Sequence, residues 1–322
     1  MKNAATSKMS PKVKHKCRET KIVKSKQHAL EKSRSTSVAT RRRQSLWRRT
    51  TSAKEARDMP IGVFDSGIGG LTVVKALRKI LPNEDIIYFG DTARVPYGSK
   101  SPQTITQFAF QDTEFLIARH VKMIIVACHS ASSVCLDDLK KSYNLPIIGV
   151  IEPGAKAAVQ ATNNNRVGVI GTQATILSGA YERAIKNLNR EVEIVAKATP
   201  LFVPLAEEGW ITNPISYQVA KIYLAPMVAE NIDTLLLGCT HYPLLKSTIS
   251  KVFRNKVKIV DASLETALET KIVLEKNNLI NRKKKPHALR FYLSDLTPNF
   301  SDIGRRFLGS NLTEVYRASL SE

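Results

Sequence analysis

The sequence lacks the features of a membrane protein or a disulfide-stabilised protein. In 322 residues no apolar run approaches the roughly 18 residues needed to span a bilayer, and no N-terminal segment has the apolar middle of a secretory signal. The four cysteines, Cys17, Cys128, Cys135 and Cys239, include no C-x-x-C pair and are irregularly spaced. This pattern indicates neither a disulfide framework nor a zinc knuckle. We therefore expect a soluble, cytoplasmic protein with reduced thiols.

Signatures of nucleotide and metal binding are also missing or weak. The glycine-rich stretch DSGIGG at residues 65–70 does not fit G-x-G-x-x-G, and it lacks the Lys-Ser/Thr of a phosphate-binding loop. Cys239 and His241 could supply two metal ligands, but the spacing of the remaining histidines suggests no third or fourth. We expect no metal.

Positive charge is concentrated at the N-terminus. The chain has a formal net charge of +21 at pH 7, and residues 1–58 contain 18 Lys and Arg against 4 Asp and Glu. Because this segment has few large apolar residues, we expect it to be disordered. It could be a solvated tail, a targeting peptide, or a tether to nucleic acid or a gyrase-type partner. Translation from Met59 is a further alternative.

From Pro60 onward, short apolar runs alternate with amphipathic stretches. Strands are predicted at residues 60–65, 85–91, 121–128, 145–152, 166–172, 192–199, 232–239 and 256–262, and residues 69–81 read as an amphipathic helix. Strands that are apolar on both faces and separated by helices are typical of parallel sheets. The predicted class is α/β, and the chain length favours two domains.

Reactive side chains stand where several of these strands end. In an open parallel sheet, ligands bind at the carboxyl ends of the strands. Those ends carry Asp65 and Ser66, Asp91, Cys128, Thr172, and Cys239 with Thr240 and His241. Each of the two cysteines precedes hydroxyl residues suited to cap a helix, and the N-terminus of a helix lowers the pKa of a thiol from its free value of about 8.5.

The segments IIVACHSASS and TLLLGCTHYP repeat one design in the two halves of the chain. Two thiols on equivalent strand ends could face each other across a ligand, which suggests proton transfer on both faces of one carbon. From spacing alone, two unrelated buried cysteines explain the pattern equally well. Cys135, which lies in a helical stretch, is expected to pack in the core.

Ordered motifs from Met59 to the C-terminus resemble glutamate racemase, of the cofactor-independent aspartate/glutamate racemase superfamily. The motifs include PIGVFDSGIGG, YFGDTARVPYG, VACHSASS, VGVIGTQATILSGAY, PLFVPLAEEGW and TLLLGCTHYPLL. The resemblance implies two similar parallel-sheet α/β domains related by pseudo-twofold symmetry, with the active site in the cleft between them. The first domain would comprise residues 59–153 and 265–322, and the second residues 154–264.

The same resemblance implies an activity and residue roles. The protein would interconvert L- and D-glutamate without a cofactor, supplying D-glutamate for peptidoglycan; an aspartate or broad-specificity racemase is the alternative. Cys128, assisted by Asp65, would exchange the Cα proton on the D face. Cys239, assisted by His241 and one of the adjacent Glu207 and Glu208, of which Glu207 is preferred, would exchange it on the L face. Substrate-binding residues would be Asp65, Ser66, Pro96, Tyr97, Gly98, Cys128, His129, Ser130, Thr172, Cys239, Thr240 and His241. A homodimer is expected, with nucleic acid contacted only through residues 1–58.

The chain departs from the family after the first cysteine. The family has Asn-Thr there, whereas this chain has His129 and Ser130. Histidine can donate a hydrogen bond as an amide would, but it is larger and can carry a proton. A charged imidazole would favour the thiolate of Cys128 and shift the pH profile. A ring turned away would leave substrate binding to the backbone N–H.

Overall fold

The structure, a computed structural model, describes residues 52–283, 288–296 and 300–320. They belong to one compact unit, Thr51–Glu322. Cys17 and most of the basic N-terminal segment lie outside the described residues. Within these residues, no helix is long and apolar enough to cross a membrane.

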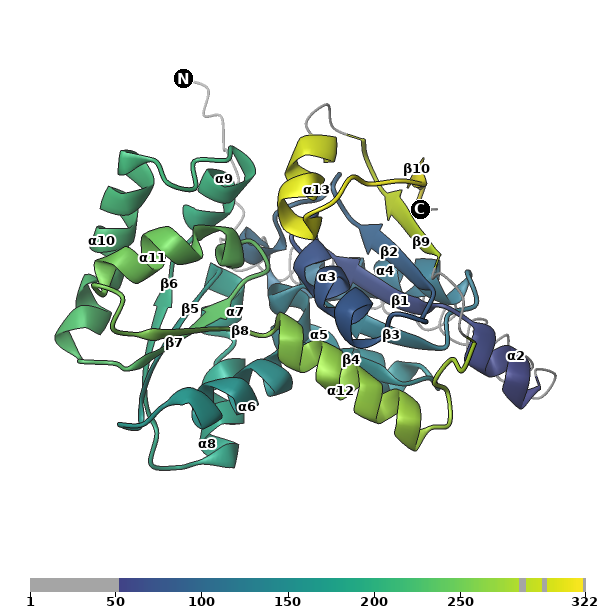
Figure 1. Cartoon of the computed structure of the whole chain (residues 1–322), viewed down its shortest axis with the longest axis horizontal. Helices are drawn as coiled ribbons and strands as arrows, with labels where there is room; N and C mark the ends of the chain where they lie inside the picture. The colour runs from purple at the N-terminus through teal and green to yellow at the C-terminus, as the bar shows by residue number, and fades with distance from the viewer. Residues whose placement is uncertain (1–51, 284–287, 297–299, 321–322) are drawn as a thin grey trace, which may run out of the picture. The chain divides into compact units, whose positions relative to one another are not determined.

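The described strands form two sheets in which every neighbouring pair is parallel (Figure 1). The six-stranded sheet has the order β10-β9-β2-β1-β3-β4, and the four-stranded sheet has the order β6-β5-β7-β8. The bounds are β1 Ile61–Asp65, β2 Ile86–Gly90, β3 Met123–Val126, β4 Ile147–Gly149, β5 Arg166–Gly171, β6 Glu193–Ala198, β7 Thr234–Gly238, β8 Lys258–Asp261, β9 Leu289–Leu293 and β10 Val315–Arg317.

Helices connect most of the strands. The α-helices are α2 Ala53–Asp58, α3 Leu71–Ile80, α4 Pro102–Ile117, α5 His129–Ser142, α6 Ile151–Ala161, α7 Gln173–Leu177, α8 Ala180–Leu188, α9 Phe202–Glu207, α10 Pro214–Ala229, α11 Lys246–Val252, α12 Ser263–Lys276 and α13 Phe300–Leu308. Two 3-10 helices, η1 Tyr97–Ser99 and η2 Tyr242–Leu245, complete the set in the described residues. Local sequence explains several starts: Ser101 caps α4 and Asn213 caps α10, and each cap is followed by a proline.

The two sheets repeat one chain path. In the first, the strands adjoin in the order β2-β1-β3-β4, and in the second the corresponding order is β6-β5-β7-β8. The strands β3 and β7 therefore occupy equivalent places, and these are the strands that the two candidate cysteines follow. The predicted α/β class and its eight strands are confirmed.

The strands are apolar on both faces because helices cover both faces. In β1, Ile61 and Val63 pack with α3, α12 and α13, whereas Phe64 packs on the opposite face with α4 and α5. In the second sheet, Ile170 faces α9, α10 and α11, and Val169 faces α6 and α8. This double burial fixes the carboxyl ends of the strands, where the loops begin.

Residues 52–58 correct one prediction. They were expected to be disordered with the rest of the basic segment, but Ala53–Asp58 form helix α2. The Ser52 hydroxyl accepts a hydrogen bond from the Glu55 N–H, and the Glu55 carboxylate accepts one from the Ser52 N–H, which is a capping box. The Ser-x-x-Glu spacing indicates the start of a helix, but the expectation of disorder was based on the basic composition of the whole segment.

Strands β9 and β10 were not predicted. β9 lies beside β2, with Ile86 opposite Leu289, and β10 lies beside β9. Both are partly exposed, and β10 spans only three residues, so neither shows a continuous apolar run. The predicted domain boundaries fall inside α6 and α12 and stay a prediction.

A buried ion pair joins four segments near the amino ends of the first sheet's strands. The Lys122 ammonium bonds to the Glu84 carboxylate and donates to the Arg57 carbonyl at 2.7 Å. The Glu84 carboxylate also accepts from the Asn281 N–H at 2.7 Å. The side chains of Lys122 and Glu84 are 0% and 1% exposed, so each charge depends on the other.

We predict that Lys122→Met lowers the free energy of unfolding by about 3–5 kcal/mol, because it leaves the Glu84 carboxylate buried without a charged partner. Urea unfolding measures the change. The control is Arg305→Met, which breaks the exposed pair with Asp302 and should change stability little. Equal effects of the two substitutions would contradict the assignment.

Candidate active site

Residues from both sheets line one small cavity at the carboxyl ends of the strands. It is lined by Ser66, Pro96, Tyr97, Gly98, Cys128, His129, Ser130, Thr172, Val203, Cys239, Thr240 and His241. Of the predicted substrate-binding residues, only Asp65 is outside this lining, and it bonds to Thr240. Both cysteines line the same cavity, which favours a paired role over two unrelated buried cysteines.

The cavity is small. Only about 20 Å³ is open to the centre of a water molecule, which is room for one or two waters. An amino acid is larger, so the walls must move apart before one can enter.

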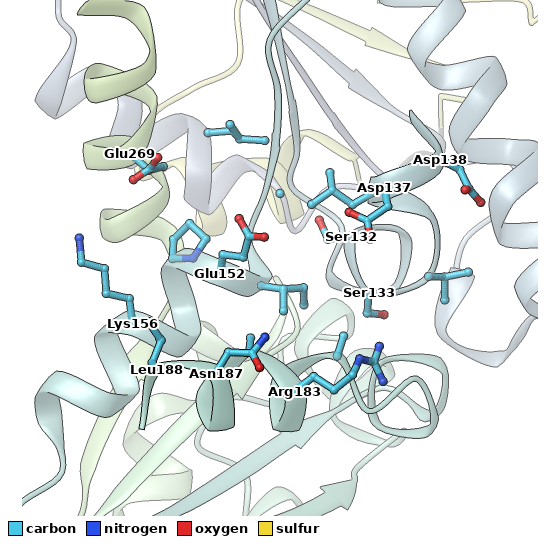
Figure 2. A pocket seen from close by; sticks show the side chains of 18 of the residues that line it. Ser132, Ser133, Asp137, Asp138, Glu152, Lys156, Arg183, Asn187, Leu188 and Glu269 are labelled. Carbon is cyan, nitrogen blue, oxygen red and sulfur yellow. The ribbon is translucent and has the colours of Figure 1, made fainter. Parts of the chain in front are cut away.

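A larger cavity of about 750 Å³ lies elsewhere, among α5, β4, α6, α8 and α12 (Figure 2). Acidic and basic side chains share its lining, including Glu152, Lys156, Arg183 and Glu269. Its described lining contains no cysteine or histidine. The larger volume therefore lacks the thiols of the small cavity.

Cys128 follows β3 and forms the N-cap of α5. Burial, and next the charge of Asp65, raise the pKa of its thiol to about 12. Hydrogen bonds from the Ala131 and Ser66 backbones act in the opposite direction but are weaker. The prediction that the helix end lowers this pKa is wrong, because desolvation outweighs the dipole. Cys128 is a neutral thiol at pH 7.

The predicted serine caps are also absent from the described residues. The Ser130 hydroxyl bonds to Thr172, and the Ser132 hydroxyl donates to the Val126 carbonyl. No side chain caps α5. The second cysteine is followed by the four-residue η2 before an α-helix begins, so the helix-end environment predicted for both thiols applies only to Cys128.

Asp65 ends β1 and organises the turn that follows it. Its Oδ2 accepts hydrogen bonds from the N–H groups of Gly67 at 3.2 Å and Gly70 at 3.0 Å. Its Oδ1 accepts from the Thr240 hydroxyl at 3.4 Å. Burial raises the pKa of Asp65, although the nearby His241 opposes this. Asp65 thus connects the first strand's turn to the loop of the second cysteine.

Gly69 allows this turn to come close to that loop. A Cβ on Gly69 would overlap the Thr240 hydroxyl and lie 2.9 Å from His241 Nδ1. Any side chain here would displace the second cysteine's loop. The sequence analysis tested the glycines of DSGIGG only as a nucleotide-binding loop, and their spacing offered no signal for this cross-sheet contact.

Cys239 follows β7 and is paired with His241. Its Sγ lies 3.8 Å from His241 Nδ1, and His241 Nε2 lies 2.9 Å from Glu207 Oε1. Burial alone would lower the pKa of His241, but the hydrogen bonds to Cys239 and Glu207 outweigh it and raise the pKa to about 10. His241 is therefore an imidazolium at pH 7. Glu207 ends α9, whereas the adjacent Glu208 is exposed.

Two contacts hold the walls of the cavity together across the sheets. The Ser130 hydroxyl lies 2.8 Å from the Thr172 hydroxyl, which also caps α7. Gly98 packs so closely against Thr172 that a Cβ would overlap the threonine side chain. Any larger residue at position 98 would push the η1 segment out of the cavity wall.

His129 is 5% exposed and lines the cavity. Neither of its ring nitrogens has a hydrogen-bond partner among the described residues. Burial lowers the pKa of His129 to about 3, so its ring is uncharged. A charged imidazole acting on Cys128 is thereby excluded at neutral pH.

Val203, on α9, is a cavity residue that the sequence analysis missed. An apolar residue on a helix carries no sequence signal for a site. Cys135 packs in the core and donates to the Ala131 carbonyl at 3.2 Å, as predicted. Across the described residues, no group of three or more His, Cys, Asp or Glu side chains could hold a metal.

Known proteins share both the sequence and the structure. The Asp/Glu/Hydantoin racemase family profile matches residues 62–269. A glutamate racemase from Geobacter metallireducens is 49% identical over 81% of this chain and 96% of its own. The crystal structure of a Francisella tularensis glutamate racemase in complex with D-glutamate has 44% identity and a TM-score of 0.77, covering 82% of this chain and 98% of that one. A Bacillus anthracis glutamate racemase structure has 38% identity and a TM-score of 0.78, with the same coverage. This chain belongs to the Asp/Glu/hydantoin racemase family.

Proposed function

We propose that this protein interconverts L- and D-glutamate, with Cys128 and Cys239 taking and returning the Cα proton on opposite faces of the substrate. The observation that carries the proposal is that two thiols, from equivalent strands of two repeated sheets, line one cavity. The identity to glutamate racemases, one of them described with D-glutamate bound, supports glutamate as the substrate. In this role the protein supplies D-glutamate for peptidoglycan.

The two thiols have complementary environments. Cys128 is buried beside the Asp65 carboxylate, which keeps it a neutral proton donor. Cys239 lies 3.8 Å from Nδ1 of the His241 imidazolium, whereas no such cation adjoins Cys128 among the described residues that line the cavity. In the proposed mechanism Cys128 is the acid and Cys239 the base of the L-to-D direction, which is what inversion without moving the substrate requires.

In the L-to-D direction, the Cys239 thiolate forms an S–H bond as the Cα–H bond of L-glutamate breaks. The electron pair left on Cα is shared with the α-carboxylate. The Cys128 S–H bond then breaks as its proton bonds to the opposite face of Cα, giving D-glutamate. The reaction leaves Cys128 as thiolate and Cys239 as thiol, so the D-to-L direction starts from that state.

The developing charge needs stabilisation, since a Cα proton is a far weaker acid than a thiol. A turnover near 10 per second corresponds to a barrier of roughly 16 kcal/mol. The first turn of α5 has no side-chain cap, so its N–H groups and the positive helix end suit a carboxylate. The small cavity leaves room for few waters besides the substrate, which strengthens these interactions.

The carboxylates have distinct positioning roles. Glu207 accepts a hydrogen bond from His241 and keeps that ring charged and oriented toward Cys239. Asp65, whose charge adds to burial in raising the pKa of Cys128, keeps that thiol protonated as the acid of the L-to-D direction and favours its reprotonation when it acts as the base in the opposite direction. Ser66, Tyr97, Gly98, Ser130, Thr172 and Thr240 bind the amino and carboxylate groups.

We also propose a cytoplasmic homodimer. Contact with nucleic acid through residues 1–58 remains a prediction, and most of that segment lies outside the described residues.

We predict that L-glutamate incubated with the enzyme in deuterium oxide yields D-glutamate labelled at Cα. Cys128→Ser and Cys239→Ser should each reduce racemisation by about a thousandfold or more, because each removes one of the two acid-base groups. Chiral chromatography with mass spectrometry measures both product and label.

Cys135→Ser is the matched control and should racemise normally, since its hydroxyl can keep the bond to the Ala131 carbonyl. Unlabelled product, normal turnover by either active-site variant, or reaction with aspartate but not glutamate would refute the proposed function.

Glu207→Gln should lower kcat/KM for L-glutamate by roughly tenfold, the effect of about 1.4 kcal/mol of lost stabilisation. The pKa of His241 is raised partly by Glu207, so its loss lets the ring deprotonate at lower pH. The alkaline limb of the L-to-D pH profile should therefore move to lower pH. Glu208→Gln, which changes an exposed neighbour, should match the wild type; if Glu208→Gln moves the limb instead, the positioning role is wrong.

His129→Asn should change KM by a few-fold and leave the shape of the pH profile unaltered, because His129 is uncharged throughout the working range. His129→Leu removes both hydrogen-bonding nitrogens and should raise KM by about tenfold, the worth of one hydrogen bond. Steady-state kinetics between about pH 6 and about pH 9 measure both. A pH inflection present in the wild type and lost in His129→Asn would mean that the ring titrates.

A further inference from the structure

A buried polar cluster lies behind the cavity wall formed by Pro96, Tyr97 and Gly98. It contains the carboxylates of Asp91, which follows β2, and Asp112, on α4; both residues are 0% exposed. The Tyr97 hydroxyl bonds to Asp91 Oδ2 and lies 2.8 Å from Asp112 Oδ2. None of the catalytic steps above uses this cluster.

The hydrogen bonds of the cluster require one more proton than two ionised carboxylates leave. The Tyr97 hydroxyl has a single hydrogen, so it can donate to only one of its two carboxylate neighbours. If both carboxylates were ionised, the other would face an oxygen lone pair at 2.8 Å. A proton on Asp112 resolves this, because Asp112 then donates to Tyr97 and Tyr97 donates to Asp91.

The charges lead to the same protonation state. Arg94 donates from Nε to Asp91 Oδ2 and from Nη2 to Asp112 Oδ1 at 3.1 Å. One guanidinium neutralises one carboxylate, and a second ionised carboxylate would be a buried charge without a partner. Asp91 accepts one further hydrogen bond, from the Ser294 hydroxyl at 2.8 Å, so the extra proton is assigned to Asp112.

The surroundings of Asp112 on balance disfavour its negative charge. Burial is the main cause that raises the pKa of Asp112 well above its usual value, and Asp91 adds to it. Arg94 and the Tyr97 hydroxyl oppose the rise, whereas the more distant Asp65 adds to it. From α5, the neighbouring titratable group is the buried Cys135, whose pKa is raised by burial first and by nearby charges including Asp112.

We propose that Asp112 is a positioning residue: it holds a proton at neutral pH and donates it to the Tyr97 hydroxyl, which fixes the Pro96–Gly98 wall of the cavity.

The consequence for the cavity follows from the contacts of Gly98. Gly98 is the residue after Tyr97, and it packs directly against Thr172 of the second sheet. Thr172 in turn bonds to Ser130, next to the first cysteine's motif. Tyr97 is itself 0% exposed. Displacement of its ring would therefore move the wall on which both sheets meet.

Substitutions at the two carboxylates test the proposal. Asp112→Asn supplies an uncharged amide that can donate to Tyr97 and accept from Arg94, so kcat/KM for L-glutamate should stay within about threefold of the wild type. Asp112→Leu removes both bonds and should raise KM by about tenfold or more, with a smaller change in kcat. Asp91→Asn removes the ionised partner of Arg94 and should be much more damaging than Asp112→Asn.

The pH dependence of stability distinguishes the protonated from the ionised form. A carboxyl that stays protonated in the fold but ionises in the unfolded chain makes stability fall as pH rises above its ordinary value near 4. Asp112→Asn removes that loss. The melting temperature of Asp112→Asn minus that of the wild type should therefore become more positive from about pH 5 to about pH 8.

Infrared difference spectra provide a second test. The wild type should show a carboxylic acid band at pH 7 that Asp112→Asn lacks.

Three results would overturn the proposal: Asp112→Asn as damaging as Asp112→Leu or unable to fold, a melting-temperature difference that is flat or falls with pH, or no carboxylic acid band. The kinetic consequence depends on the proposed racemase activity, but the melting and infrared measurements do not. A protein without racemase activity could still show the protonated Asp112, so the two proposals fail separately.

Discussion

Almost every ionisable group around the cavity is out of contact with water, and this burial determines which groups carry charge. Cys128, Asp65, Asp112 and His129 are all pushed toward their neutral forms by desolvation. His241 is the exception, because two direct hydrogen bonds outweigh the same effect. The chemistry of the site thus depends less on which residues are present than on which few of them have a partner strong enough to keep them charged.

The repeated chain path makes the two thiols equivalent in position but not in environment. Both follow the third strand of their sheet, yet Cys128 faces the Asp65 carboxylate and Cys239 faces the His241 imidazolium. The asymmetry comes from the loops: Asp65 ends the first strand of the six-stranded sheet, whereas Thr172 follows the corresponding strand of the other. A repeated scaffold can therefore supply symmetry around a carbon atom while its loops supply opposite protonation states.

The parts of this structure that depend on continuous local patterns could be predicted from sequence. The eight predicted strands and the reactive residues at their ends follow from apolar runs, and the resemblance identified nearly all of the cavity lining. What could not be predicted depends on distant partners. The short edge strands β9 and β10 have no apolar run of their own, Gly69 is needed only because Thr240 packs on it, and the pKa of Cys128 reflects three-dimensional burial rather than its place at a helix end. The helix at residues 52–58 was predictable, but its Ser-x-x-Glu signal was masked by the basic composition around it.

The unequal protonation of the two cysteines has a consequence for the free enzyme between turnovers. Under the proposed roles, release of D-glutamate leaves Cys128 as thiolate and Cys239 as thiol, the reverse of the state from which the L-to-D reaction starts. The unliganded protein therefore exists as two protonation isomers, and only one of them accepts L-glutamate productively. Until protons redistribute, the protonation state of the two cysteines in each molecule depends on the enantiomer that it last released. The step that returns the two cysteines to their starting protonation state therefore belongs to the catalytic cycle, although no substrate is bound during it.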